Sequence, residues 1–171
     1  VEAALVTIER ESPAVYIEGY TNSDGELFEP LLDPSTNDYH VTVTKDGYST
    51  DYTVPVSPEI PNPFNRDVSV IAGDLTEVTL LIDELSSLTI QTRDINNNDP
   101  LPNIEFQMIG TDEDKILGND PEGNPVYKFD EVITTDENGV YTFDNNLEWN
   151  TYEFVLDGES AANYSLAGSA P

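Results

Sequence analysis

Residues 133–143 read Ile-Thr-Thr-Asp-Glu-Asn-Gly-Val-Tyr-Thr-Phe, and Tyr152-Glu-Phe-Val-Leu follows after a short linker. The pattern predicts a threonine-rich strand, a tight Asx-Gly turn, a second strand and a tyrosine-led third strand. A related phrase occurs earlier, as Tyr20-Thr-Asn-Ser-Asp-Gly-Glu-Leu-Phe followed by Tyr39-His-Val-Thr-Val. The two copies keep nearly the same internal spacing. Such repetition predicts tandem β modules, which commonly serve as spacers, stalks or binding arrays.

Alternation of apolar and polar residues dominates the whole chain, whereas helical periodicity is scarce. We therefore predict an all-β fold. Strands are expected at residues 4–9, 14–20, 27–32, 39–45, 52–56, 68–71, 76–82, 87–93, 104–109, 126–134, 140–143 and 151–156. The strands at 68–71 and 76–82 are expected to form a hairpin around Gly73-Asp74. The segment Thr111–Pro125 lacks periodicity and is interpreted as an inserted loop or a long hairpin tip.

Two modules are expected, at residues 1–84 and 85–171, with the division in the short segment Asp83-Glu-Leu. Each is predicted to be an antiparallel Greek-key β-sandwich. The first module begins at what should be its second strand, and the second is incomplete at its C-terminus because the tail 157–171 has no closing strand. Two explanations stay open. Either the parent protein continues on both sides, or subunits exchange strands through unpaired sheet edges.

The run from Thr134 to Phe154, together with Asp46-Gly-Tyr after Thr42-Val-Thr-Lys, resembles carboxypeptidase regulatory-like modules. These are transthyretin-like and immunoglobulin-like β-sandwiches of bacterial pilin-like surface proteins. Asn150 stands where that family often has glycine. The resemblance covers most of the chain and implies a location at the bacterial cell surface or outside the cell. It specifies the fold better than the function, because such modules act as spacers, adhesin segments and enzyme appendages.

The charge of the chain excludes several partners. Thirty-four acidic residues face six basic ones, which gives a formal net charge of −28. Binding to nucleic acid needs the opposite sign, and an anionic membrane would repel the chain. No apolar run approaches the roughly 20 residues that span a bilayer, so no membrane insertion is expected in this segment. The absence of cysteine excludes disulfides and metal–thiolate sites.

The acidic turn at 94–99 is the first candidate metal site. Asp94, Asn96, Asn98 and Asp99 place several oxygen ligands together, as Ca²⁺ prefers. The turn departs from the standard calcium loop, because it lacks the glycine and the final glutamate of that loop. The alternative is an Asx-rich turn that satisfies its own backbone. A second acidic group, in the segment 112–122, is either mobile or holds a cation. Ca²⁺ is thus the candidate cofactor.

Catalysis has little support in the sequence. His40 is the sole histidine and is expected to face solvent from a strand, so no nucleophilic triad is apparent. We predict that the chain is not an enzyme. A covalent crosslink of the kind found in collagen-adhesin modules could use Lys45, Lys115 or Lys128, with Asn103 or Asp144 as conceivable partners of Lys128. The sequence provides no evidence for any of these pairings.

Trp149 is the candidate ligand-binding residue. It lies in a predicted loop, where it either stacks on a sugar or a protein partner or plugs the end of a sandwich. The function predicted first is that of a non-catalytic spacer in an exported cell-surface or pilus-associated protein. Its partners would be other domains of the same protein or other subunits. The alternatives are an adhesin for a glycan or protein and a filament subunit assembled by strand exchange.

Overall fold

The structure, a computed structural model, describes residues 1–167. Strands contain 43% of the residues and helices 5%, and the sheets are antiparallel, so the prediction of an all-β fold is confirmed. No helix among the described residues has both the length and the apolar composition needed to cross a membrane.

The chain forms two compact units, which are described separately. The first contains Val1–Leu85 together with Leu117–Val126, and the second contains Ser86–Ile116 and the residues from Tyr127 onward. The first break thus falls one residue after the division expected between residues 84 and 85. The sequence placed Leu117–Val126 in the second module. In the structure this segment groups with the first unit, because a strand within it pairs with Asn62–Pro63.

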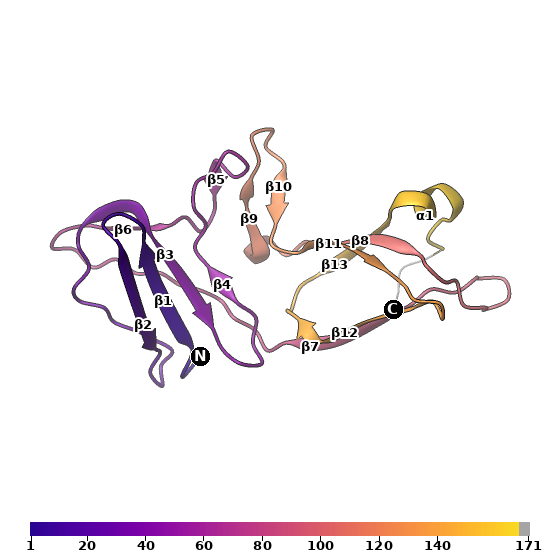
Figure 1. The fold of residues 1–171 in the computed structure, drawn as a ribbon, viewed down its shortest axis with the longest axis horizontal. Coiled ribbons are helices and arrows are strands. Elements are labelled where there is room, and N and C mark those ends of the chain that lie inside the picture. The colour runs from indigo at the N-terminus through magenta and orange to yellow at the C-terminus, as the bar shows by residue number, and fades with distance from the viewer. Residues whose placement is uncertain (168–171) are drawn as a thin grey trace. The chain divides into compact units, whose positions relative to one another are not determined.

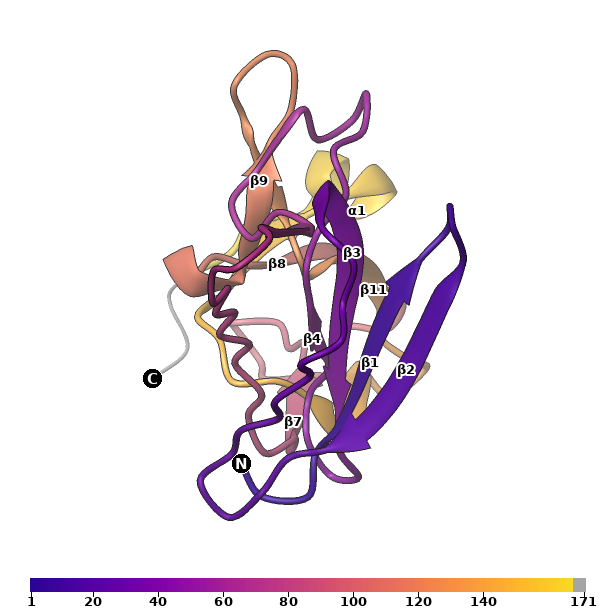
Figure 2. The same ribbon diagram turned by 90° about the vertical axis from the view of Figure 1, so that its left-hand side faces the viewer.

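The first unit is built around one sheet in the order β2-β1-β3-β4, with β6 also paired to β3. These strands are β1 (Leu5–Arg10), β2 (Val15–Tyr20), β3 (Ser35–Thr44), β4 (Asp51–Tyr52) and β6 (Val68–Val70). Figure 2 shows β1 lying between β2 and β3. A smaller sheet has the order β10-β9-β5, with β5 (Asn62–Pro63), β9 (Ile116–Asn119) and β10 (Pro125–Tyr127). The segment 111–125 is therefore the hairpin tip rather than the unstructured loop.

Three strand predictions in the first unit are wrong. The second strand of the first repeat, expected at residues 27–32, does not form. Thr76–Ile82 has no strand, and β6 pairs with β3 instead of forming the expected hairpin. The predicted strand at 52–56 is reduced to the two residues of β4. In the segment Thr76–Ile82, the Leu81 amide donates to the Asp51 side chain, with Oδ2 at 2.6 Å, and not to the backbone of a neighbouring strand. The turn itself forms, because the Asp74 amide donates to the carbonyl of Ile71.

The second unit has two sheets, in the orders β11-β8-β13 and β12-β7 (Figure 1). Their strands are β7 (Ser86–Gln91), β8 (Glu105–Gly110), β11 (Asp130–Thr134), β12 (Val140–Leu147) and β13 (Tyr152–Leu156). The strand expected over 126–134 is divided in two, because the chain leaves the ladder at Lys128 and Phe129. Phe129 packs against the core instead, and Lys128 reaches a buried carboxylate. A short 3₁₀ turn, η1 (Glu113–Lys115), precedes β9.

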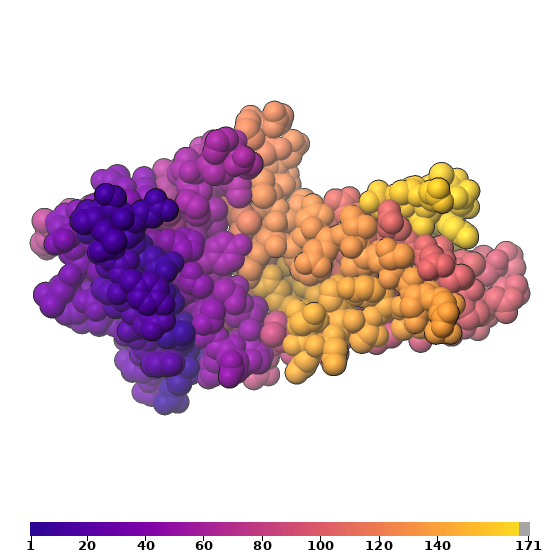
Figure 3. All heavy atoms as spheres, in the orientation of Figure 1, coloured from indigo at the N-terminus to yellow at the C-terminus, as the bar shows by residue number. Residues whose placement is uncertain are grey.

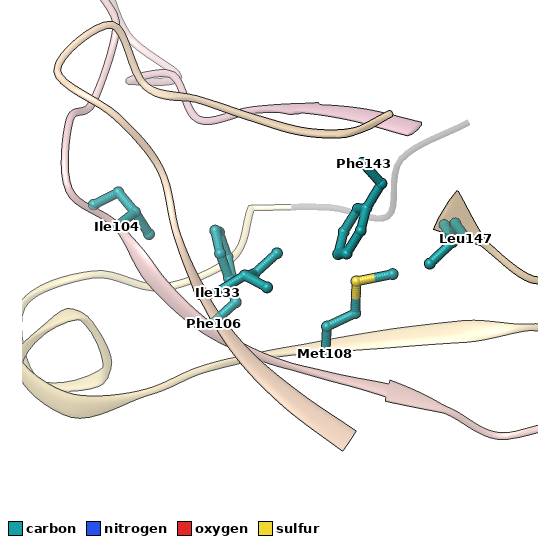
Figure 4. Close-up of a cluster of buried hydrophobic side chains, with 6 residues drawn as sticks. All are labelled: Ile104, Phe106, Met108, Ile133, Phe143 and Leu147. Atoms are coloured by element: carbon teal, nitrogen blue, oxygen red, sulfur yellow. The ribbon is translucent and has the colours of Figure 1, made fainter. Parts of the chain in front are cut away.

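The core of the second unit lies between its two sheets. Six buried apolar side chains from β8, β11, β12 and the residue before β8 point toward one another in Figure 4: Ile104, Phe106, Met108, Ile133, Phe143 and Leu147. Alternate residues of β8 are buried, as the period of two in a strand requires. Met108 is completely buried. The alternation seen in the sequence thus produces one inward face per strand.

The tail contains a short helix that the sequence analysis did not predict. This helix, α1 (Gly158–Asn163), begins where the Asp157 side chain accepts a hydrogen bond from the Gly158 amide. It contacts β8 and β13, and its atoms, yellow in Figure 3, lie at the surface. No closing strand occurs in the described part of this tail. Its last residues, 168–171, lie outside the described residues.

The turn in the opening sequence joins β11 to β12. Asp136 Oδ1 accepts hydrogen bonds from the amides of Asn138 and Val140, both at 2.8 Å, and these bonds lower the pKa of the Asp136 carboxyl. Gly139 has a φ of +71°, and a Cβ there would lie 2.7 Å from the carbonyl oxygen of Thr92. Both the backbone conformation and the close approach therefore require glycine.

We expect Gly139→Ala to lower the free energy of unfolding by about 1 to 3 kcal/mol more than Gly73→Ala. Gly73 also has a positive φ, at +82°, but a Cβ there meets nothing within 4 Å. Both variants carry the backbone strain, and only the first adds the clash. Urea denaturation of the two variants measures the difference. Equal losses of stability would show that the turn relaxes around the added methyl group.

Candidate functional site

The predicted calcium turn is closed by its own side chains. Asp94 Oδ1 accepts hydrogen bonds from the Asn96 amide at 2.7 Å and from Asn96 Nδ2 at 3.1 Å. Asp99 Oδ2 accepts one from Asn97 Nδ2 at 2.8 Å. Asn98 takes a left-handed φ of 63°, and its amide donates to the carbonyl of Asp94. This is the geometry of the alternative interpretation, an Asx-rich turn. Calcium binding by Asp94, Asn96, Asn98 and Asp99 stays a prediction.

The second acidic group is divided between the two units. Asp112 belongs to the second unit and Asp120 to the first. Asp120 accepts hydrogen bonds from the Asn124 amide at 2.7 Å and from Asn124 Nδ2 at 2.9 Å, and these bonds lower the pKa of its carboxyl. Among the described residues, no group of three or more His, Cys, Asp or Glu side chains is placed to hold a metal ion.

Trp149 is exposed, with 69% of its surface accessible. It therefore does not plug the end of the fold. Hydrogen bonds fix the chain on both sides of it. The Asp112 amide donates to Asn150 Oδ1 at 3.0 Å, the Thr151 amide donates to Asp112 Oδ2 at 3.2 Å, and the Tyr152 hydroxyl donates to the carbonyl of Glu148 at 2.7 Å. The structure thus presents an exposed indole on an anchored loop.

A buried ionic cluster lies directly beside this loop and was missed by the sequence analysis. Lys128 Nζ lies 2.7 Å from Glu148 Oε2, and Lys115 Nζ lies 3.5 Å from the same oxygen. The exposed fractions of these side chains are 12%, 7% and 9% for Lys128, Lys115 and Glu148. Lys128 therefore pairs with a carboxylate that the crosslink hypothesis did not consider. A sequence signal was present, since Lys128 stands between Tyr127 and Phe129 and Glu148 between Leu147 and Trp149.

The cluster and the Trp149 loop are parts of one arrangement. Tyr152 packs its ring edge-on against Phe129, with the ring centroids 5.3 Å apart. Burial raises the pKa of the Tyr152 phenol strongly, and the negative charges of Glu148 and Asp112 add to the effect. The phenol is therefore a hydrogen-bond donor at neutral pH. Its bond to Glu148 fixes the backbone that carries both the buried carboxylate and the exposed indole.

His40 lies beside a carboxylate and a buried hydroxyl. Its Nδ1 lies 3.0 Å from Asp67 Oδ1, and the same oxygen accepts a hydrogen bond from Thr53 Oγ1 at 2.8 Å. The expectation that His40 faces solvent is only partly met, since its side chain is 32% exposed. Thr53 is completely buried, and its hydroxyl lies on the Nδ1 side of the ring.

Arg10 of the first unit is also buried although charged, with 6% of its surface exposed. Its guanidinium lies 4.7 Å from the centroid of the Tyr39 ring, and its Nε donates to the carbonyl of Pro13 at 3.0 Å. The Tyr39 hydroxyl donates to the carbonyl of Asp33. Arg10 Nη2 also lies 3.6 Å from Asp33 Oδ2. Arg10 thus joins β1 to β3 and to the loop that precedes β3.

A groove of about 930 Å³ lies in the second unit. It lies between β7 and β13, and most of its lining side chains are apolar. Asn163, the last residue of α1, and residues 164–167, which follow it, line the groove as well. Sequence analysis did not predict this groove, although it predicted that the second module lacks a strand.

No protein-family model, curated protein or solved structure matches this chain. The resemblance to carboxypeptidase regulatory-like modules therefore stays a prediction.

Proposed function

We propose that this chain is a non-catalytic structural module of an exported bacterial cell-surface or pilus-associated protein. In this proposal its two units are tandem Greek-key β-sandwiches that hold other domains or subunits of the parent protein at a distance. The observation that supports this proposal most directly is that several ionisable side chains make contacts within the fold. Glu148 and Lys128 are buried against each other, Arg10 joins two strands, and the single histidine binds Asp67.

The composition and the sheets support this function. Two sheets enclose the core of the second unit, as in a β-sandwich. The net charge of −28 favours solubility and keeps copies of the chain apart. The resemblance noted above supports export and a place at the bacterial surface, where modules of that kind repeat in tandem.

Sedimentation and forced unfolding test the spacer role. We expect the full chain to remain monomeric over a wide range of concentration, and single molecules pulled from their ends to show two separate unfolding events. A single unfolding event would contradict two tandem modules. Turnover of an ester, peptide or glycoside substrate that His40→Ala abolishes would contradict the absence of catalysis.

The exposed indole favours a second candidate function, that of a glycan- or protein-binding adhesin. A tryptophan fixed in a loop supplies a flat apolar surface at little entropic cost. In this case a glycan array would show binding that Trp149→Ala abolishes. Phe64→Ala is the matched control, because Phe64 is also exposed, at 60%, but lies in the first unit. If neither the wild-type chain nor the control binds any glycan, glycan adhesion is rejected.

A further inference from the structure

The groove of the second unit is bordered by two free sheet edges. β7 pairs with β12, and β13 pairs with β8. Among the described residues no strand pairs with the other edge of either one. The lining includes consecutive strand residues, 88–91 of β7 and 152–156 of β13, as expected where a strand borders a groove with its edge. A strand that offered only one face would contribute alternate residues.

The hydrogen bonds next to these strands identify the backbone groups at the free edges. The Thr111 amide donates to the carbonyl of Thr151, and the Asp157 amide donates to the carbonyl of Glu105. Because bonding alternates along an antiparallel pair, the backbone of Val155 faces β8 and that of Phe154 and Leu156 faces the groove. The same argument applies to β7. The Thr92 amide donates to the carbonyl of Gly139, so the backbone of Thr89 and Gln91 faces the groove.

The floor of the groove is apolar and only partly covered. Leu88 and Ile90 of β7 and Phe154 and Leu156 of β13 pack against the core but stay half-buried. The fully buried side chains come instead from β8, β11, β12 and Ile104. The two sheets thus enclose the core on the side of β11 and β12 and leave it only partly covered between β7 and β13.

The charges near the groove select the kind of chain that could fill it. The second unit has three basic residues, and two of them, Lys115 and Lys128, are buried with Glu148. Arg93, its only exposed base, lines the groove together with Asp94 and the exposed Glu153. The unit as a whole is acidic, with fifteen Asp and Glu residues against these three bases. A second copy of this chain would bring a further formal charge of −28. Charge complementarity therefore favours a different, basic partner.

We propose that the groove binds an extended strand of a partner protein in which apolar and basic residues alternate. The backbone of the partner strand pairs with the free edge of β13 or β7, its apolar side chains cover the half-buried floor, and its basic side chains face the acidic surroundings. β7 has six residues and β13 has five, so a partner segment of about 17–20 Å matches their length. This binding is a property of the second unit and does not depend on the spacer role.

Peptide titration of the full chain, followed by NMR, tests the proposal. The probe is a short capped peptide of alternating valine and lysine. On binding, we expect slower amide exchange at Phe154 and Leu156, or at Thr89 and Gln91, and no change at Val155. An alternating valine–glutamate peptide should bind about tenfold more weakly or worse at low salt. A valine–lysine peptide with its edge-facing amides methylated should lose affinity as well, because it cannot complete the ladder.

A pair of matched variants locates the site. Ile95 is 75% exposed and lines the groove, whereas Ile71 is 58% exposed and belongs to the first unit. Ile95→Lys should weaken binding of the valine–lysine peptide about tenfold by removing an apolar contact and adding a like charge, and Ile71→Lys should not. Both positions are exposed, so both variants should fold.

Several outcomes would overturn the proposal. The first is equal binding of the lysine and glutamate peptides, and the second is an equal effect of the two isoleucine variants. Protection of the Phe154 and Leu156 amides in the free monomer would show that the chain fills its own groove. Self-association with protection of these amides would assign the groove to a second copy.

Discussion

Glu148→Gln is expected to lower the free energy of unfolding of the second unit by about 3 to 5 kcal/mol, the usual result of removing one partner of a buried ion pair. The carboxylate of Glu148 neutralises Lys128, whose Nζ lies 2.7 Å from Oε2. The same oxygen lies 3.5 Å from Lys115 Nζ. Glutamine keeps the shape and removes the charge, so the Lys128 ammonium would remain buried beside a neutral amide. The fluorescence of Trp149, the only tryptophan of the chain, reports this unfolding during urea denaturation.

Glu153→Gln is the matched control for this prediction. Glu153 lies on β13, close to Glu148 in sequence, and its side chain is exposed. The same chemical change there should alter the stability by less than about 0.5 kcal/mol. Similar effects at both positions would mean that water reaches the cluster and screens its charges. The fixed backbone around Trp149 would then depend on its hydrogen bonds alone.

The Phe143→Ala substitution should cost about 3 to 5 kcal/mol of unfolding free energy by leaving a cavity between the two sheets. Phe143 is 4% exposed, and its ring centroid lies 6.0 Å from that of Phe129 and 4.9 Å from that of Tyr141. These aromatic contacts would be lost together with the buried area. The urea transition of the second unit, again followed by Trp149 fluorescence, measures the effect.

Phe28→Ala provides the comparison for the core variant. Phe28 belongs to the first unit and is 73% exposed, so its removal leaves no cavity. Little change is expected in either unit. A small effect of Phe143→Ala would show that the neighbouring side chains collapse into the space, which the partly covered side between β7 and β13 could permit.

The two largest predictions connect stability to the candidate surfaces. Glu148 precedes Trp149 directly, and the Tyr152 hydroxyl binds the Glu148 carbonyl. A loss of the cluster is therefore expected to release the loop that presents the indole. The groove lies between β7 and β13, whose side chains pack against the core that contains Phe143. The positions of the two strand edges therefore depend on the packing that Phe143 supports. Each binding experiment thus needs a variant that is first shown to be folded.

Local sequence patterns were sufficient to predict most strands and the Asx-Gly turn at 136–139. A strand that buries one face needs alternating residues, and a turn with positive φ needs glycine, so both leave a signal within a few positions. The sequence left open whether Trp149 is exposed and which groups the Asp94 side chain binds. Side chains in loops have no regular alternation between buried and exposed positions. The tertiary structure decided both.

The sequence by itself determined the all-β fold, the acidic character of the chain and the strand-turn-strand unit formed by β11 and β12. The earlier copy of this pattern forms its turn, but no strand follows Gly25 until β3. Only the tertiary structure decided that Lys115, Lys128 and Glu148 meet, that β9 pairs with β5 and that Thr76–Ile82 forms no strand. The physical reason is the separation in sequence between the groups that interact. Alternation and turn chemistry act between neighbours in the chain, whereas ion pairing, strand partners and a partly covered core depend on groups that folding brings together from distant positions.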